Sequence, residues 1–98
     1  MLKIKIRVVS NFVIPGLEDE NEIDFDHPTI TLREILEEIS SRSLNRVKFI
    51  RSSNGAVDPM AFDIEINGLP NQGSRETLET VLKGGDTITI NLLPLGGG

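Results

Sequence analysis

The residues with the clearest chemical potential stand at the end of the sequence, where Pro94 and Leu95 precede Gly96, Gly97 and Gly98. Glycine has no side chain to bury, and ordering it costs more backbone entropy than ordering any other residue. Three successive glycines are therefore typical of a thin, extended and flexible tail. Such a tail suits insertion into a narrow channel of another protein, where the carboxylate of Gly98 can be chemically activated. A frayed end without function is the alternative, because chain termini are often disordered.

Elsewhere the sequence offers few groups that could do chemistry. It has no cysteine, which excludes disulfides and thiol nucleophiles. Its one histidine, His27, precedes Pro28 and is expected in a surface loop, and no set of histidine and carboxylates has the spacing of metal ligands. Gly84-Gly85 lacks the pattern of a phosphate-binding loop. We therefore expect a chain that is not catalytic alone, with no metal and no permanently bound cofactor.

Length, charge and hydropathy limit the classes of partner. With 98 residues the chain is expected to form one domain. Its formal net charge of −5 argues against nucleic acid, which selects basic surfaces. No stretch approaches the ~20 apolar residues of a membrane helix, and the alternating start is unlike a signal peptide. These features predict a cytoplasmic protein that binds other proteins, but neither nucleic acid nor membrane.

The first half of the sequence predicts two strands and a helix. Period-two hydrophobicity indicates strands at residues 2–8 and 22–26, pairing as an antiparallel hairpin around a long turn. Thr31 and Glu34 form a capping box, which marks the start of a helix that is expected to end near Arg42. Its apolar stripe has i, i+3, i+4, i+7 spacing and consists of Leu32, Ile35, Leu36 and Ile39.

The second half predicts two more strands and a shorter helical segment. A strand is expected at residues 60–66, then a turn at Asn67-Gly68, then a short helix or helical turn at 74–82. The last strand is expected at 87–93, and Pro94 ends it because proline lacks an N–H. Residues 47–51 fit either a short strand or an irregular segment. The positions expected to face inward here are Met60, Phe62, Ile64, Ile66, Leu78, Val81, Leu82, Ile88, Ile90 and Leu92.

The helix is too apolar on one face to stand alone, so a sheet must cover it in a two-layer arrangement. The order of elements predicts an α+β fold, in which a mixed sheet of four to five strands packs on one main helix. This is the β-grasp, or ubiquitin-like, architecture. We assign it to residues 1–94 and treat residues 95–98 as a flexible glycine-rich tail.

The last third of the sequence resembles the ubiquitin-like sulfur-carrier family. The resemblance rests on Asn67-Gly68 after a strand, the Gly85-Asp86 turn, the final apolar strand, Pro94, and the closing Gly97-Gly98. The helix start at residues 31–36 also matches. The family includes the small subunit of molybdopterin synthase and the sulfur carrier of thiamine biosynthesis. The length of the chain favours the molybdopterin branch.

The resemblance implies a function for the tail. An adenylating enzyme of the ubiquitin-activating type would use ATP to activate the carboxylate of Gly98, and sulfur from a sulfur-donor protein would convert it to a thiocarboxylate. The carrier would then donate sulfur in cofactor biosynthesis, with molybdenum cofactor favoured over thiamine, together with a synthase large subunit. The residues that would contact these partners are Leu93, Pro94, Leu95, Gly96 and Gly97.

Two other functions fit the same residues. The protein could be a modifier joined through Gly98 to lysines of target proteins, since that reaction needs the same tail and activation. It could instead be a β-grasp interaction module with an inert tail. A modest basic cluster at Arg42, Arg46, Lys48 and Arg51 is interpreted either as plain surface or as a partner contact.

The tail hypothesis predicts that Gly96 to Gly98 are mobile in the free protein and become ordered only in a partner. Backbone NMR order parameters below ~0.6 at these residues would agree with it. Order parameters equal to those of the final strand would indicate that the tail serves the fold, and would remove the mobile arm on which activation depends.

Overall fold

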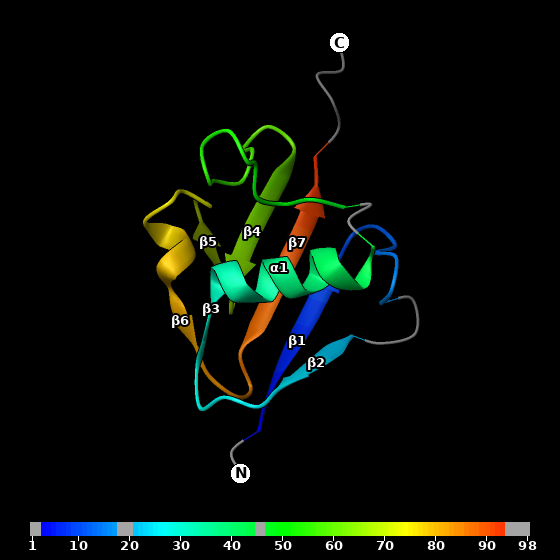
Figure 1. Cartoon of the computed structure of the whole chain (residues 1–98), viewed down its shortest axis with the longest axis vertical. Coiled ribbons are helices and arrows are strands. Elements are labelled where there is room, and N and C mark those ends of the chain that lie inside the picture. Colours follow the sequence, from blue (N-terminus) through cyan, green and yellow to red (C-terminus); the bar gives the residue numbers. More distant parts are fainter. Residues whose placement is uncertain (1–2, 18–20, 45–46, 94–98) are drawn as a thin grey trace.

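Strand β7 (Thr87–Leu92) runs through the middle of a five-stranded sheet in the computed structural model, which describes residues 3–17, 21–44 and 47–93. The strand order is β2 (Glu22–Phe25), β1 (Ile4–Ser10), β7, β4 (Phe62–Ile66) and β5 (Leu69–Asn71). β7 is parallel to β1 and antiparallel to β4 (Figure 1). The strands expected at residues 2–8, 22–26, 60–66 and 87–93 are therefore present, with slightly different bounds.

Helix α1 (Leu32–Arg42) lies across one face of this sheet (Figure 1). A second, two-stranded sheet pairs β3 (Ile30–Thr31) with β6 (Val81–Leu82), and the 3₁₀ helix η1 (Thr77–Glu79) precedes β6. A mixed five-stranded sheet that packs on one main helix confirms the predicted β-grasp fold. No helix in the described ranges is long and apolar enough to cross a membrane.

The start of α1 follows from its sequence. Thr31 Oγ1 accepts a hydrogen bond from the backbone N–H of Glu34 at 3.2 Å, and Glu34 Oε1 accepts one from the N–H of Thr31 at 3.1 Å. This is the predicted capping box, which satisfies two amide groups that the helix leaves unpaired. Hydrogen bonds from the backbone and then the hydroxyl of Thr31 lower the pKa of Glu34, because they stabilise its ionised form.

The core forms where the apolar stripe of α1 meets the sheet. All four residues of that stripe are fully buried, as predicted. The sheet side of the core includes the expected residues Ile64, Ile88 and Ile90, together with Ile4, Ile6 and Phe25. Phe49 is also buried, at 1% exposure, although it lies outside every strand and helix.

Three residues expected to face inward are exposed to solvent. Met60 lies in a turn before β4 and is 76% exposed. Val81 is 60% exposed because it shares a two-residue strand with Leu82, and neighbouring residues of a strand point to opposite faces. Leu92 is 45% exposed because β7 runs on past the part of the sheet that α1 covers (Figure 1).

Two segments that the sequence left open also take a definite form. Residues 47–51 are irregular apart from a single bridge between Ile50 and Val57. β5 was not predicted as a strand, because it has three residues and contains Pro70. A proline is tolerated there because β5 lies at the edge of the sheet.

The core packing makes a prediction for Leu36, which is 0% exposed. Leu36→Ala removes buried apolar atoms and leaves a cavity, so we expect it to lower the free energy of unfolding by about 2–5 kcal/mol in urea titrations. The neighbouring exposed Glu37 supplies the control, since Glu37→Ala is expected to change stability by less than about 0.5 kcal/mol. Equal stability of both variants and the parent would place Leu36 outside the core.

Candidate functional site

The candidate site is the point where the chain leaves the sheet at the end of β7. Leu93 is the last described residue there and is half-buried. The other predicted site residues, Pro94 and the stretch 95–98 with the reactive Gly98, lie outside the described residues, as does the boundary proposed at residue 94. The structure therefore describes the base from which that stretch continues.

Hydrogen bonds hold this base from both sides. On one side, Asn11 Oδ1 accepts a bond from the N–H of Leu92 at 2.8 Å, and Asn11 Nδ2 donates to the carbonyl oxygen of Leu92 at 3.2 Å. On the other side, the N–H of Leu93 donates to the carbonyl oxygen of Ala61 at 2.8 Å. We call these contacts the exit clamp. They continue the pairing of β7 beyond the strands on either side.

Asn11 reaches β7 because β1 ends just before it. The β1–β7 register ends with Ser10 opposite Ile90, and the chain then turns away from the sheet. The hydroxyl of Ser10 donates to the carbonyl oxygen of Phe12 at 2.6 Å across this turn. An asparagine amide carries the same donor and acceptor groups as a peptide unit. Its side chain can therefore take the position that the next backbone residue of β1 would otherwise hold.

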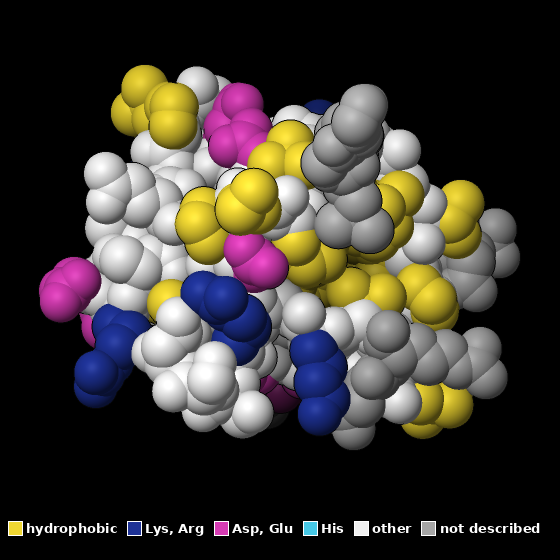
Figure 2. Space-filling view, turned by 90° about the horizontal axis from the view of Figure 1, so that it is seen from above, with side chains coloured by type: hydrophobic (Ala, Val, Ile, Leu, Met, Phe, Trp, Pro, Cys, Tyr) yellow, Lys and Arg dark blue, Asp and Glu magenta, His cyan; other side chains and the backbone are white. Residues whose placement is uncertain are grey.

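Apolar side chains surround the exit clamp. Phe62 pairs with Leu92 in the β4–β7 register, and its ring lies 6.3 Å from that of Phe12 and 5.0 Å from that of the buried Phe49. Two strongly exposed apolar residues lie next to the clamp residues in the chain: Val13 (73%), two positions after Asn11, and Met60 (76%), directly before Ala61. Figure 2 looks down on this end of the molecule and shows hydrophobic side chains gathered there. We call the set Phe12, Val13, Met60, Phe62, Leu92 and Leu93 the exit surface.

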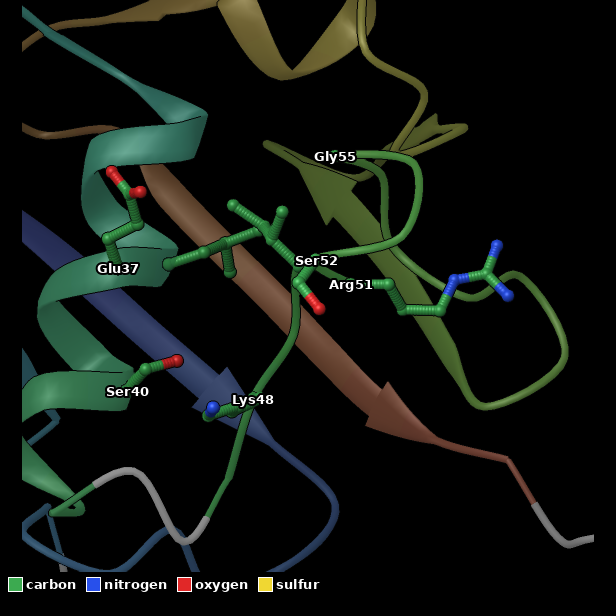
Figure 3. A pocket seen from close by; sticks show the side chains of 8 residues that line it. Glu37, Ser40, Lys48, Arg51, Ser52 and Gly55 are labelled. Atoms are coloured by element: carbon green, nitrogen blue, oxygen red, sulfur yellow. The ribbon is translucent and has the colours of Figure 1, made fainter.

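A groove of about 490 Å³ lies between α1 and the segment that follows it. Leu36, Glu37 and Ser40 line it from the helix, and Lys48, Ile50, Arg51, Ser52 and Gly55 line it from the facing segment. In Figure 3 the side chain of Arg51 extends away from α1 instead of closing over the groove. Of the predicted basic cluster, Lys48 and Arg51 thus share this groove, Arg42 forms an ion pair with Glu38 at 2.9 Å, and Arg46 lies outside the described residues.

The family-like residues Asn67, Gly68, Gly85 and Asp86 lie at the opposite end of β7. Asn67 and Gly68 both have positive φ, 52° and 84°, which is typical of the tight turn that joins a hairpin such as β4–β5. Asn67 Oδ1 accepts from the N–H of Thr87 at 2.9 Å, and Asn67 Nδ2 donates to Asp86 Oδ1 at 3.1 Å. These residues start β7 in the correct register and do not take part in the exit.

Asp86 is buried at this end, with 9% exposure. Burial alone would raise its pKa, but three contacts outweigh burial and lower it. The N–H of Lys83 donates to Oδ2 at 2.9 Å, the Asn67 amide donates to Oδ1, and the ammonium of Lys83 lies 3.7 Å from Oδ1. All three favour the ionised carboxylate.

Sequence reasoning predicted a tail that lies outside the described residues, and it missed Asn11 and Ala61, which hold the end of β7. Asn11 follows a strand and precedes a turn, which is an ordinary position for asparagine. The one local signal is that Asn11 directly follows the alternating segment that forms β1. Its amide therefore lies where β7 loses the backbone of β1 as a hydrogen-bonding partner. His27 is exposed in a bend, as expected. Within residues 3–17, 21–44 and 47–93, no group of three or more His, Asp or Glu could hold a metal ion.

Comparison with known proteins finds solved structures of similar shape. No family model and no curated protein matches the sequence. Among solved structures, the HVO 2177 protein of Haloferax volcanii has a TM-score of 0.68 and 17% identity, over 97% of this chain and 88% of that one. A candidate molybdopterin converting factor, subunit 1, from Pyrococcus furiosus has a TM-score of 0.61 and 20% identity, over 93% of this chain and 99% of that one. Small archaeal modifier protein 1 from Methanosarcina acetivorans has a TM-score of 0.62 and 21% identity, over 100% of both chains.

These matches confirm the resemblance at the level of the fold. Each of them covers nearly all of the described architecture, and the names of two of them are those of a molybdopterin converting factor and of a small modifier. At these low identities the similarity is one of shape.

The Asp86 contacts predict a pH-dependent contribution to stability. Because the folded pKa is lowered, the contribution is present above the unfolded value of ~3.9 and is lost as pH falls through the lower folded pKa. Asp86→Asn is therefore expected to cost about 1–3 kcal/mol of unfolding free energy at neutral pH. The difference from the parent should shrink below about pH 4. A difference that stays constant across that range would mean that the carboxylate charge is not involved.

Proposed function

We propose that this protein is a sulfur carrier whose Gly98 is adenylated by a partner enzyme and converted to a thiocarboxylate. The observation that carries the proposal is the exit clamp, which fixes Leu92 and Leu93 at one end of the central strand, directly before the glycine-rich stretch. A β-grasp domain that holds the base of such a stretch is suited to present its last residue to another protein. The proposal assigns no catalytic residue to the domain itself.

The chemistry would take two steps at the carboxyl group of Gly98. In the first, a carboxylate oxygen of Gly98 attacks the α-phosphorus of ATP in the partner's site, and pyrophosphate leaves. In the second, a sulfide supplied by a sulfur-donor protein attacks the carbonyl carbon and expels AMP, which leaves a thiocarboxylate. ATP is thus a substrate held by the partner, and the carrier supplies only the acyl group.

The residues around the exit would have two roles, docking to the partner and guiding the tail into its channel. The exit surface is apolar and partly exposed, so it would dock against the partner around the mouth of its channel. Leu93, Pro94 and Leu95 would hold the entry to the channel, while Gly96 and Gly97 would pass where side chains do not fit. Docking of the folded domain would make the attack on ATP effectively intramolecular.

The pathway that we favour is molybdenum cofactor biosynthesis, with thiamine biosynthesis second. The length of the chain and the structural similarity to a molybdopterin converting factor subunit support this choice. The partners would be an adenylating enzyme, a synthase large subunit and a sulfur-donor protein, all in the cytoplasm. Neither nucleic acid nor membrane has a part in this scheme.

Two alternatives have specific support. The similarity to small archaeal modifier proteins favours conjugation of Gly98 to lysines of other proteins, which begins with the same adenylation. The groove beside α1, with Lys48 and Arg51 at its wall, favours an interaction module. The two alternatives differ from the carrier in the product formed at Gly98.

The test is an intact-mass measurement after incubation with ATP, sulfide and the adenylating enzyme encoded in the same genome. The carrier proposal predicts replacement of one oxygen atom by sulfur, located to the C-terminal peptide by fragmentation. Deleting Gly98 should abolish the change. Appending one residue after Gly98 should abolish it too, because the carbonyl of Gly98 is then an amide.

The outcomes separate the three functions. If no sulfur is incorporated but target lysines become linked to Gly98, the protein is a modifier. If neither product forms with that enzyme, and deletion of Gly97 and Gly98 leaves the binding of partners unchanged, the protein is an interaction module. Substitution of an exposed residue outside both the exit surface and the groove, such as Asp24→Ala in the edge strand β2, serves as the control that should leave activation unchanged.

A further inference from the structure

We propose that Asn11 is a positioning residue that sets the point and direction at which the chain leaves the sheet for activation. The inference rests on the proposed function of Gly98, but the contacts that suggest it are independent of that function. Asn11 is exposed and lies 81 positions from Leu92 in the sequence. Its side chain nevertheless makes hydrogen bonds to both backbone polar groups of Leu92.

These two bonds occupy the same backbone groups of Leu92 that a neighbouring strand would pair with. The N–H of Leu92 donates to Oδ1 at 2.8 Å, and Nδ2 donates to the Leu92 carbonyl at 3.2 Å. Both distances fall within or at the edge of the ordinary range for N–H···O bonds. β1 itself pairs only as far as Ile90. Asn11 therefore extends the pairing on the β1 side of β7 after the backbone of β1 has turned away.

The opposite side of β7 is held differently. Leu92 lies opposite Phe62 in the β4–β7 register, and the N–H of Leu93 donates to the carbonyl of Ala61. Strand pairing to β4 thus fixes the chain from one side through ordinary backbone contacts. The β1 side depends on a single side chain. Removing that side chain should free one edge of Leu92 without disturbing the rest of the sheet.

A fixed base matters because the reacting atom lies only a few residues beyond it. The six residues from Leu93 to Gly98 can span at most about 20 Å when fully extended. If Leu92 and Leu93 separate from their partners, the arm becomes longer and its direction is no longer set. The concentration of correctly oriented carboxylate in the partner's site then falls. Docking through the exit surface should be affected less, since the apolar side chains remain.

The experiment compares Asn11→Ala, Asn11→Asp and a matched control, Asn71→Ala. Asn11→Ala removes both bonds, while Asn11→Asp keeps an acceptor for the Leu92 N–H but loses the donor to its carbonyl. Asn71 is matched because its Oδ1 accepts from the N–H of Gly73 at 2.8 Å and its Nδ2 donates to the carbonyl of Thr77 at 3.3 Å. It lies in the edge strand β5, which pairs with β4 and not with β7.

The first measurement is amide hydrogen exchange of the free protein, followed by NMR. In Asn11→Ala we expect exchange of the Leu92 amide to accelerate by about tenfold or more, because it loses its acceptor. The Ile90 amide should keep the protection that it has in the parent. Asn11→Asp should leave the Leu92 amide closer to the parent, and Asn71→Ala should not change it. Unchanged protection of Leu92 in Asn11→Ala would refute the clamp.

The second measurement is the rate of ATP–pyrophosphate exchange by the same adenylating enzyme as a function of carrier concentration. We expect Asn11→Ala to lower kcat by about tenfold while KM changes by about twofold or less, because orientation is lost and the docking surface is kept. Asn71→Ala should retain parental values even if its melting temperature falls. A purely structural role of Asn11 would instead lower activity only in proportion to the folded fraction.

The outcomes keep the two proposals apart. One outcome is that the parent is adenylated and Asn11→Ala has the same kcat although its Leu92 amide exchanges faster. In that case the positioning role is wrong and the proposed function stands. If the parent is not adenylated at all, the proposed function fails, and the positioning role fails with it. The hydrogen-exchange data then show only whether Asn11 protects the Leu92 amide at the end of β7.

Discussion

The parallel pairing of β1 with β7 is the constraint on which the rest of the structure depends. It places Arg7 opposite Thr87 and Ser10 opposite Ile90, and so joins an early strand to a late one. Parallel neighbours cannot be linked by a tight turn, so everything between them must form the crossover. Here that crossover contains β2, α1 and the β4–β5 hairpin. Helix α1 lies over the strands that this pairing brings together (Figure 1), and its buried residues belong to the same core as those strands.

Both ends of β7 are held by the side chain of an asparagine that acts like backbone. At the start, Asn67 Oδ1 accepts from the N–H of Thr87. At the end, Asn11 Oδ1 accepts from the N–H of Leu92. Both asparagines are exposed, but Asn67 also donates to the buried Asp86, whereas Asn11 lies beside the apolar exit surface. The first contact sets the register of the strand, and the second lies where the chain continues toward Gly98.

The sequence could predict the features that depend on residues close together in the chain. The capping box and the apolar stripe of α1 lie within a dozen residues, and the Asn67-Gly68 turn needs only its own backbone preference. The buried faces of β1 and β7 followed from alternation. Contacts over longer distances could not be found in this way. Asn11 acts on a residue 81 positions away, and Phe49 is buried although no periodicity marks it. Leu92 breaks an alternation that was correct up to Ile90, because coverage by α1 ends before the strand does.

The central position of β7 also affects the order in which the molecule can be made. β7 follows every other described strand in the chain, yet it is the strand on which both halves of the sheet rest. During synthesis, residues up to about Asp86 lack the strand that would bury Ile6 and Ile64 beside Ile88 and Ile90, so the domain cannot complete its core. The sheet can close only once β7 has emerged from the ribosome. A folded domain is therefore one whose chain has been made at least through β7, so a partner that recognises the folded surface would pass over shorter, incomplete chains.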